Sequence, residues 1–287
     1  MNRVKAGFCL FLFVLSCFYL KDILKDLNIL DYIPVENKES SFKKFVDVKL
    51  KEPSNLLNLN NKIIPKEKKE GILNGSLKIE NDNNNDPIVY IFNTHQTEEY
   101  AKNAYNITPT VVTASNILSD ELHSLGISSI VENKDIIKET KRRGYDYTGT
   151  YTVSFEYLKE RKKENDSLEY FFDIHRDSIT GDVARTKIKN KNYATIMFLV
   201  GANYDGYEVH VNNSNIIKSY LDKNYPGLVR NTYIQKKSSF YQYYSPKMFL
   251  VEVGGPDNTL EEVYNSTKAL AESINYYIKE DKWKRYL

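Results

Sequence analysis

The sequence predicts an α/β fold in which helices flank a doubly wound, mostly parallel sheet. Two observations support this prediction. From residue 87 onward, short apolar runs alternate with segments whose apolar residues recur at helical spacing. The runs are continuously apolar, as expected for strands that are buried on both faces. In such a sheet the functional site lies beyond the carboxyl ends of the strands, so the residues that follow each run are of most interest.

Each predicted strand is followed by a polar residue or a glycine. The strands are predicted at residues 88–92, 127–131, 170–174, 194–200 and 248–251. Helices are predicted around residues 117–125, 153–161, 217–221 and 258–274. Gly126 ends the first of these helices, and Pro226-Gly227 ends the third. Asn258, with Glu261 three residues later, is the predicted N-terminal cap of the last helix.

The N-terminus has the pattern of a targeting segment. Arg3 and Lys5 precede an apolar run over 6–20, which is shorter than the roughly 20 residues that a spanning helix needs. No A-x-A-like cleavage site follows the run, so the sequence favours a membrane anchor helix at 1–21 over a cleaved secretory signal. A lipoprotein signal ending at Cys17 is the third alternative. Because the cations precede the run, we expect a single-pass protein of the cell membrane whose later residues are extracytoplasmic.

The composition divides the rest of the chain in two. Residues 22–86 contain a charge cluster at 66–70 and an Asn/Asp tract at 81–86, which is typical of an extracytoplasmic stalk. The folded domain is predicted at 87–287. Both cysteines lie within the first twenty residues, so this domain has no disulfide and no thiolate ligand. A formal net charge of +2 gives no sign of a nucleic-acid partner.

Imidazole and carboxylate groups follow three of the predicted strands. His95 comes after the first strand, His175 after the third, and Glu252 after the fifth. Two imidazoles and a carboxylate are a common set of catalytic zinc ligands that leaves one position for water. A further carboxylate can then take a proton from that water during attack on a carbonyl group. This pattern favours a metal-dependent hydrolase.

Other polar residues near these strand ends leave alternatives open. Arg176 and Asp177 form either a structural ion pair or a second shell that orients metal ligands. Glu252 follows four apolar residues, so we expect it to be part-buried and to need a partner or a function. His123 lies in a helical pattern and is expected to face solvent, whereas His210 is expected in a polar loop.

Four sequence blocks resemble the stage II sporulation protein P family. The block N-T-H-Q-T-E-E-Y at 93–100 is similar to the family's H-T-H-T-S-E-S-Y, and D-I-H-R-D-S at 173–178 matches its most distinctive block. Y-P-G-L at 225–228 and L-V-E-V-G at 250–254 resemble two more. The blocks occur in the family's order and cover about residues 87 to 275.

The resemblance implies an amidase-like fold and a zinc-dependent activity on peptidoglycan. The expected reaction is that of an N-acetylmuramoyl-L-alanine amidase, with an added endopeptidase activity on stem-peptide cross-links. The family also implies septal wall thinning and engulfment during sporulation, together with stage II sporulation proteins D and M. Two rival functions are a non-catalytic wall-binding scaffold and a zinc peptidase or deacylase with a non-wall substrate.

Carried over to this sequence, the family motifs assign a role to each site residue. His95 and His175 are the expected zinc ligands, and Glu252 is the expected general base. Glu98 is the expected carboxylate ligand, with Glu99 as its rival.

The chain also departs from the family pattern, and in the segment 144–152 it lacks the S-R expected after the tyrosine. Asn93 stands where the family has the first histidine of H-T-H, so it lies outside the expected ligand set. Phe240-Tyr241-Gln242 replaces the family's Y-N-Q, and Glu132-Asn133 stands where relatives tend to have His-Asp.

Overall fold

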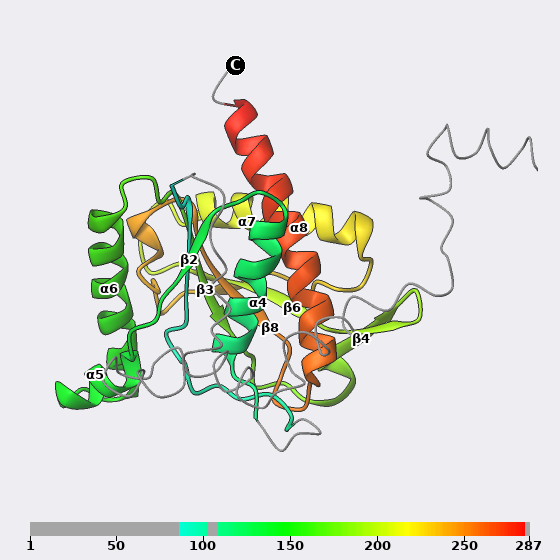
Figure 1. Cartoon of the computed structure of the whole chain (residues 1–287), viewed down its shortest axis with the longest axis horizontal. Helices are drawn as coiled ribbons and strands as arrows, with labels where there is room; N and C mark the ends of the chain where they lie inside the picture. Colours follow the sequence, from blue (N-terminus) through cyan, green and yellow to red (C-terminus); the bar gives the residue numbers. More distant parts are fainter. Residues whose placement is uncertain (1–85, 103–107, 285–287) are drawn as a thin grey trace, which may run out of the picture. The chain divides into compact units, whose positions relative to one another are not determined.

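The computed structural model of the chain describes residues 86–102 and 108–284 (Figure 1). The predicted anchor at 1–21 and nearly all of the predicted stalk at 22–86 lie outside these residues. In the two described ranges, no helix is both long enough and apolar enough to cross a bilayer.

Six strands form one sheet in the order β2-β1-β3-β8-β6-β7. The first four in this order run parallel to one another: β2 (Ser129–Val131), β1 (Val89–Phe92), β3 (Tyr170–His175) and β8 (Met248–Val253). The other two, β6 (Ile196–Gly201) and β7 (Tyr233–Gln235), run the opposite way, because β6 is antiparallel to β8. The predicted α/β class with a largely parallel sheet is therefore confirmed, although the sheet is mixed.

Helices cover both faces of the sheet (Figure 1). On one face, α4 (Val111–Ser124), α7 (Glu208–Asn224) and α8 (Leu260–Lys284) pack over the larger apolar core. On the other face, Leu158 of α6 (Thr150–Glu164) packs in a smaller core, and α5 (Ile136–Arg142) packs against α6. All four predicted helices are present, and α5 is the one additional α-helix in the part of the chain that the structure describes.

The alternation of side chains along β3 assigns residues to these two faces. Tyr170, Phe172 and Ile174 belong to the larger core, whereas Phe171 belongs to the core under α6. Successive side chains of a strand point to opposite faces, so Asp173 and His175 share the α6 face with Phe171. Polar groups at the carboxyl end of β3 thus lie on the face with fewer helices.

The segment around residues 185–201 differs from the prediction. A single strand was expected at 194–200, but Thr195 separates β5 (Lys191–Ala194) from β6. β5 pairs with β4 (Arg185–Ile188) in a two-stranded hairpin. Lys189 and Asn190 join the two strands with φ values of 47° and 64°, as a two-residue hairpin turn requires. A lysine is not typical of the first position of such a turn, so the hairpin was not predicted from the sequence.

The cap of the last helix is shifted by one residue from the prediction. The Thr259 Oγ1 accepts a hydrogen bond from the Glu262 amide at 3.2 Å, and the Thr259 amide donates to Glu262 Oε2 at 2.8 Å. This reciprocal pair is a capping box, so the predicted pair Asn258–Glu261 is wrong. Asn258 accepts a bond from the Gly255 amide instead.

A buried carboxylate after β2 joins β1, β2 and α6. Glu132 accepts hydrogen bonds from the Tyr90 hydroxyl at 2.7 Å and from the amides of Asn133 and Lys134 at 2.8 Å each. Its oxygens also form an ion pair with Arg161 at 3.1 Å. Burial alone raises the pKa of Glu132, but the hydrogen bonds from Arg161, Tyr90 and the backbone outweigh it, and the pKa is lowered. Glu132 is therefore ionised and fully bonded.

We expect Glu132→Gln to lower the free energy of unfolding by about 3 to 5 kcal/mol, because it leaves the Arg161 cation without its buried partner. Glu164 is the matched control, since it pairs with the same arginine at 3.0 Å but is exposed, and Glu164→Gln should cost no more than about 1 kcal/mol. Because the pKa of Glu132 is lowered in the fold, its contribution is present at neutral pH and is lost on acidification. Thermal unfolding at pH 7 and in acid measures both effects. Equal losses in the two variants would contradict the assignment.

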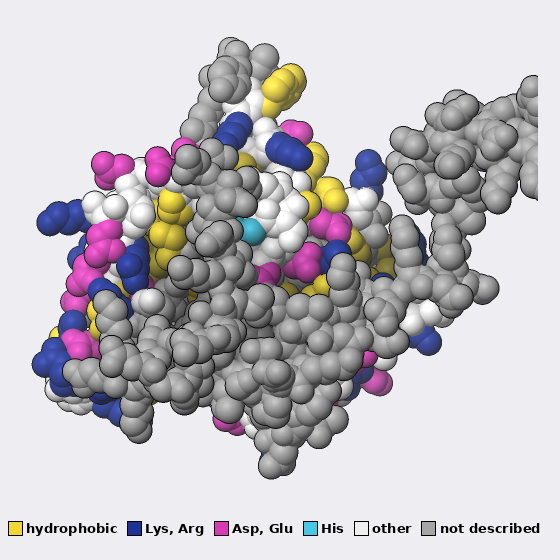
Figure 2. Space-filling model, in the orientation of Figure 1, with side chains coloured by type: hydrophobic (Ala, Val, Ile, Leu, Met, Phe, Trp, Pro, Cys, Tyr) yellow, Lys and Arg dark blue, Asp and Glu magenta, His cyan; other side chains and the backbone are white. Residues whose placement is uncertain are grey.

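Charges of both signs are interspersed on the molecular surface shown in Figure 2. Over α5 and α6, Lys and Arg side chains lie among Asp and Glu side chains. Arg143, for example, pairs with both Glu139 and Glu156. Such mixing agrees with the balanced composition and gives no extended patch of one sign over these helices.

Candidate metal centre

Three potential metal ligands meet beyond the carboxyl ends of β1 and β3. One ligand atom from each of His95, Glu98 and His175 lies within 4.8 Å of the other two. The Nδ1 of His95 is 3.3 Å from Glu98 Oε1, and the Nδ1 of His175 is 3.6 Å from Glu98 Oε2. Each carboxylate oxygen therefore faces one imidazole.

Glu98 is held in this position by the backbone around it. Its amide donates to the His95 carbonyl at 3.1 Å, which closes a turn after β1. The amide of Arg176 donates to Glu98 Oε2 at 2.8 Å. Burial raises the pKa of Glu98, but bonds with the two histidines outweigh burial and lower the pKa to about 2. The rival ligand Glu99 is exposed and lies outside the cluster.

A second carboxylate faces His175 from the opposite side of its ring. The Nε2 of His175 lies 3.0 Å from Asp173 Oδ2, within ion-pair range but without the geometry of a hydrogen bond. Asp173 is fixed by the Thr94 amide at 2.9 Å and by the Thr94 hydroxyl at 2.7 Å. A carboxylate on one imidazole nitrogen commonly directs the other nitrogen toward a metal. Although burial lowers the pKa of His175, Asp173 and Glu98 outweigh it and hold that pKa well above its ordinary value.

Sequence reasoning missed Asp173 as a site residue. The signal was present in D-I-H, because residues two apart in a strand point to the same face.

Glu252 stands beside His175 in the sheet, because the register of β3 and β8 pairs the two residues. Its Oε2 is buried and has no hydrogen-bond partner in the described part of the chain. Burial raises the pKa of Glu252 to about 7 against the opposing charge of His175, and the charges of Glu98, Asp177 and Asp173 add smaller increases. The expected partner for this part-buried carboxylate is therefore missing among the described residues, and one oxygen of Glu252 lies unbonded beside the metal-ligand cluster.

The two residues after His175 have separate roles. Asp177 forms its ion pair with Arg230 at 2.7 Å, rather than with Arg176 as one alternative had it. Arg176 supports Glu98 through its backbone amide, and among the described residues its guanidinium donates only to the Asp177 carbonyl, at 3.2 Å. Arg230 was missed because it is distant in sequence and no local pattern links it to Asp177.

Two tyrosines cover the histidines. The ring of Tyr147, in a short turn before α6, stacks on His95 with a centroid distance of 4.3 Å. The ring of Tyr151, in the first turn of α6, lies 5.1 Å from His95 and 6.2 Å from His175. Burial raises the pKa of both tyrosines, so both are neutral hydroxyls at physiological pH. Their spacing of four residues along the chain was the only sequence signal for them.

Asn93 has a structural role. Its side-chain amide donates to the Ile174 carbonyl at 2.6 Å, and its oxygen accepts from the Ser115 hydroxyl at 3.0 Å. These bonds link β1, β3 and α4 and use both ends of the Asn93 side-chain amide.

The other two histidines lie away from the site. His210 is buried in α7, not in a polar loop as predicted, and its Nδ1 is 3.1 Å from the Met248 carbonyl. His123 was expected to face solvent, but it is half-buried, and its Nε2 accepts a hydrogen bond from the Ser129 amide at 3.0 Å.

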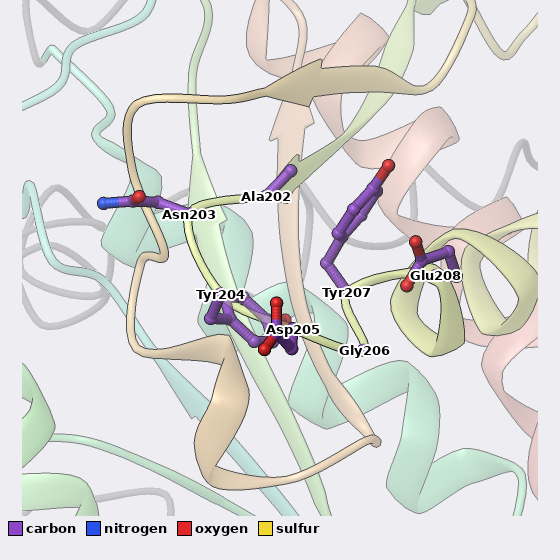
Figure 3. Close-up of a pocket in the computed structure, with 7 residues that line it drawn as sticks. All are labelled: Ala202, Asn203, Tyr204, Asp205, Gly206, Tyr207 and Glu208. Atoms are coloured by element: carbon purple, nitrogen blue, oxygen red, sulfur yellow. The ribbon is translucent and has the colours of Figure 1, made fainter.

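A hollow of about 450 Å³ lies elsewhere in the molecule, where residues 202–208 connect β6 to α7 (Figure 3). Because β6 is antiparallel to β8, its carboxyl end lies at the edge of the sheet opposite His175 and Glu252. Tyr204, Asp205 and Tyr207 contribute to its lining, but it holds none of the clustered donors. The chemistry of the site therefore lies outside this hollow.

The donor set fits a zinc ion. Two imidazole nitrogens and one carboxylate oxygen are characteristic ligands of catalytic zinc. The Nε2 of His95 is buried without a hydrogen-bond partner among the described residues, and its Nδ1 faces only Glu98, another member of the donor set. Asp173 supplies the outer carboxylate that such centres usually have.

Comparisons with known proteins bear on the identity of the chain. A family model described as stage II sporulation protein P (SpoIIP) matches residues 19–275. Stage II sporulation protein P of Bacillus subtilis (strain 168) is 30% identical over 200 residues, which cover 64% of this chain and 49% of the relative. This chain thus spans about half the length of the curated relative that it matches.

Two solved structures are also similar. The CwlD amidase from Clostridioides difficile, in complex with the GerS lipoprotein, has a TM-score of 0.46 and 14% identity, and the match covers 68% of this chain and 98% of that one. N-acetylmuramoyl-L-alanine amidase AmiC2 of Nostoc punctiforme has a TM-score of 0.39 and 13% identity over 67% and 97% of the respective chains.

Proposed function

The chain belongs to the stage II sporulation protein P family, and on this basis and the geometry of the site we propose that it is a zinc-dependent peptidoglycan hydrolase of sporulation. The proposed reaction is cleavage of the amide between the glycan and the stem peptide, as in an N-acetylmuramoyl-L-alanine amidase. Cleavage of stem-peptide cross-links is the second activity that the family implies. One observation supports the proposal most: His95, Glu98 and His175 cluster beside the unpartnered carboxylate of Glu252.

The residues of the site divide the work of amide hydrolysis. His95, His175 and Glu98 would hold Zn²⁺, which when bound polarises a carbonyl oxygen and acidifies water. Glu252 would accept the proton of the attacking water and deliver it to the leaving amide nitrogen. Asp173 would keep the His175 ring in one orientation. Tyr147 and Tyr151 would shield the histidines from bulk water.

The proposed setting is the outer side of the cell membrane, with the chain held by its N-terminal segment. Stage II sporulation proteins D and M are the proposed partners during engulfment, and peptidoglycan is the proposed substrate. These proposals rest on the family and on the basic residues that precede the N-terminal apolar run.

Digestion of purified peptidoglycan by the purified full-length protein tests the proposed activity. Mass spectrometry of the soluble products should find free stem peptides and glycan chains that have lost their peptides. An unchanged wall, in the presence of zinc, would instead favour the non-catalytic wall-binding scaffold. Products cut only within the peptides, or activity only on a non-wall amide, would favour a zinc peptidase or deacylase.

We expect Asp173→Asn to weaken zinc binding by about 10- to 100-fold, because asparagine cannot supply the negative charge that faces His175 Nε2. Ser154→Ala is the matched control, since the Ser154 hydroxyl contacts Thr94 at 2.9 Å but not the carboxylate. Competition with a chromophoric chelator measures the affinity of both variants. Wild-type affinity in Asp173→Asn would show that this carboxylate does not tune the site.

A further inference from the structure

Two consecutive aromatic residues near the site have a strained backbone. Phe240 and Tyr241 have φ values of 48° and 56°, in the left-handed region. This conformation costs roughly 1–2 kcal/mol for a residue with a side chain. The other described pair of this kind, Lys189 and Asn190, forms a two-residue hairpin turn that requires it. Phe240 and Tyr241 likewise occupy the two central positions of a turn, which the Gln242 amide closes by donating to the Ser239 carbonyl at 2.9 Å.

On the β6 side, the segment 238–242 is fixed by hydrogen bonds from a side-chain amide to the backbone of β6. The side chain of Gln242 accepts from the Gly201 amide at 2.8 Å and donates to the Leu199 carbonyl at 2.9 Å. A Cβ atom at Gly201 would stand 2.6 Å from the Ser238 carbonyl oxygen, so glycine permits the close approach of the segment.

On the α6 side, Tyr241 holds the same segment. Its ring stacks on Phe155 with a centroid distance of 4.3 Å and an interplanar angle of 15°. Its hydroxyl lies 3.1 Å from the hydroxyl of Thr152. Contacts to two elements thus offset the backbone strain and fix the direction of the neighbouring Phe240.

The strained geometry brings Phe240 to the site. Its ring centroid lies 5.4 Å from that of Tyr151, which in turn contacts both histidines of the cluster. Phe240 is only half-buried, so its ring is accessible. Phe240 thus extends the aromatic cover of the histidines beyond Tyr151.

The sheet beside Glu252 is apolar on the side of β6. Met197 of β6 pairs in register with Glu252, and Leu199 lies two residues further on the same face. Both side chains are only half-buried, which leaves an open apolar floor beside the carboxylate. A substrate amide placed at Glu252 would therefore have aliphatic side chains of β6 beside it, with the rings of Tyr151 and Phe240, tilted by 47° to each other, near the histidines.

We propose that Phe240 is a specificity-determining residue whose ring, with Tyr151, stacks on a sugar ring next to the scissile amide. The C–H groups on one face of a sugar carry a partial positive charge, which the negative face of an aromatic ring attracts. An uncharged aromatic surface suits this face better than it suits a charged stem peptide. The proposal rests on the proposed function, since it places a wall glycan beside the amide to be cut.

Steady-state cleavage of two soluble substrates by the full-length protein tests this assignment. The first is a disaccharide-peptide, and the second is the same peptide amide without its sugars. For the first substrate, Phe240→Ala should raise KM about 10-fold with little change in kcat, and Phe240→Tyr, which keeps the ring, should restore it. For the second substrate, wild type and Phe240→Ala should be equal. Tyr243→Ala is the control, because Tyr243 is an exposed ring of the same segment that packs toward Phe155 and Tyr204.

The outcomes separate this inference from the proposed function. Unchanged kinetics in Phe240→Ala, or an equal loss on both substrates, would overturn the sugar contact while leaving the hydrolase intact. If the wild type cleaves neither substrate, the hydrolase proposal fails. Calorimetric binding of the disaccharide-peptide then decides the inference by itself, with about 10-fold weaker binding expected for Phe240→Ala and unchanged affinity counting against it. Circular dichroism and zinc content establish that each variant is folded and loaded.

Discussion

Replacing Glu252 with glutamine is expected to slow the cleavage of wall amides by about 10²- to 10⁴-fold while the bound metal stays in place. The reason is geometric. Glu252 neighbours His175 in the sheet, yet it is not one of the three clustered donors, and its Oε2 has no partner among the described residues. Glutamine keeps the size of the side chain but cannot accept a proton. Zinc content by elemental analysis and release of stem peptides by mass spectrometry measure the two effects separately.

The matched control for this substitution is Glu99→Gln. Glu99 is an exposed carboxylate next to a proposed ligand, and it lies outside the cluster. This variant should cleave at the wild-type rate. If Glu252→Gln loses its zinc, Glu252 is a ligand and the role of Glu98 must be reassigned. If it cleaves at the parental rate, Glu252 has no part in the reaction.

The assembly of the site was predictable from the sequence because a topological rule gives it. His95, His175 and Glu252 follow three apolar runs, and the carboxyl ends of parallel strands meet at one edge of a sheet. The structure brings these residues together for that reason. The direction of β6 was not predictable in this way. A continuously apolar sequence pattern does not indicate the direction in which a strand runs. The β4–β5 hairpin precedes β6, which is antiparallel to β8.

What sequence reasoning missed depends on contacts between distant residues or on backbone angles. Asp177 pairs with Arg230, 53 residues away, and no periodic pattern encodes that pairing. Phe240 reaches Tyr151 only through two left-handed residues that propensity argues against. At Glu132 the sequence showed a departure from the family pattern but not its reason. The structure explains it by the hydrogen bonds that Glu132 accepts from β1 and α6.

Replacing either histidine of the cluster by alanine should remove most of the bound zinc and reduce wall cleavage to near background. Three protein ligands are the usual number for a catalytic zinc, so the loss of one leaves a site of much lower affinity. His123→Ala is the control, because His123 bonds to Ser129 away from the cluster and its loss should leave the zinc content unchanged. Elemental analysis of the purified variants measures zinc. Stoichiometric zinc in both His95→Ala and His175→Ala would remove these residues from the ligand set.

His95→Ala and His175→Ala should also differ in thermal stability, because the two imidazoles have different surroundings. A ligand that binds only the folded state adds about 2.7 kcal/mol at 100 times its Kd, so a chelator should lower the melting temperature of the wild type but not of either variant. His175→Ala should be the less stable of the two without zinc. It leaves the buried carboxylate of Asp173 without the imidazole at 3.0 Å, whereas His95 is in contact with Glu98, which keeps the Arg176 amide as a donor. A chelator effect that persists in His175→Ala would show that zinc binds elsewhere, and equal stability of the two apo variants would show that Asp173 does not depend on this imidazole.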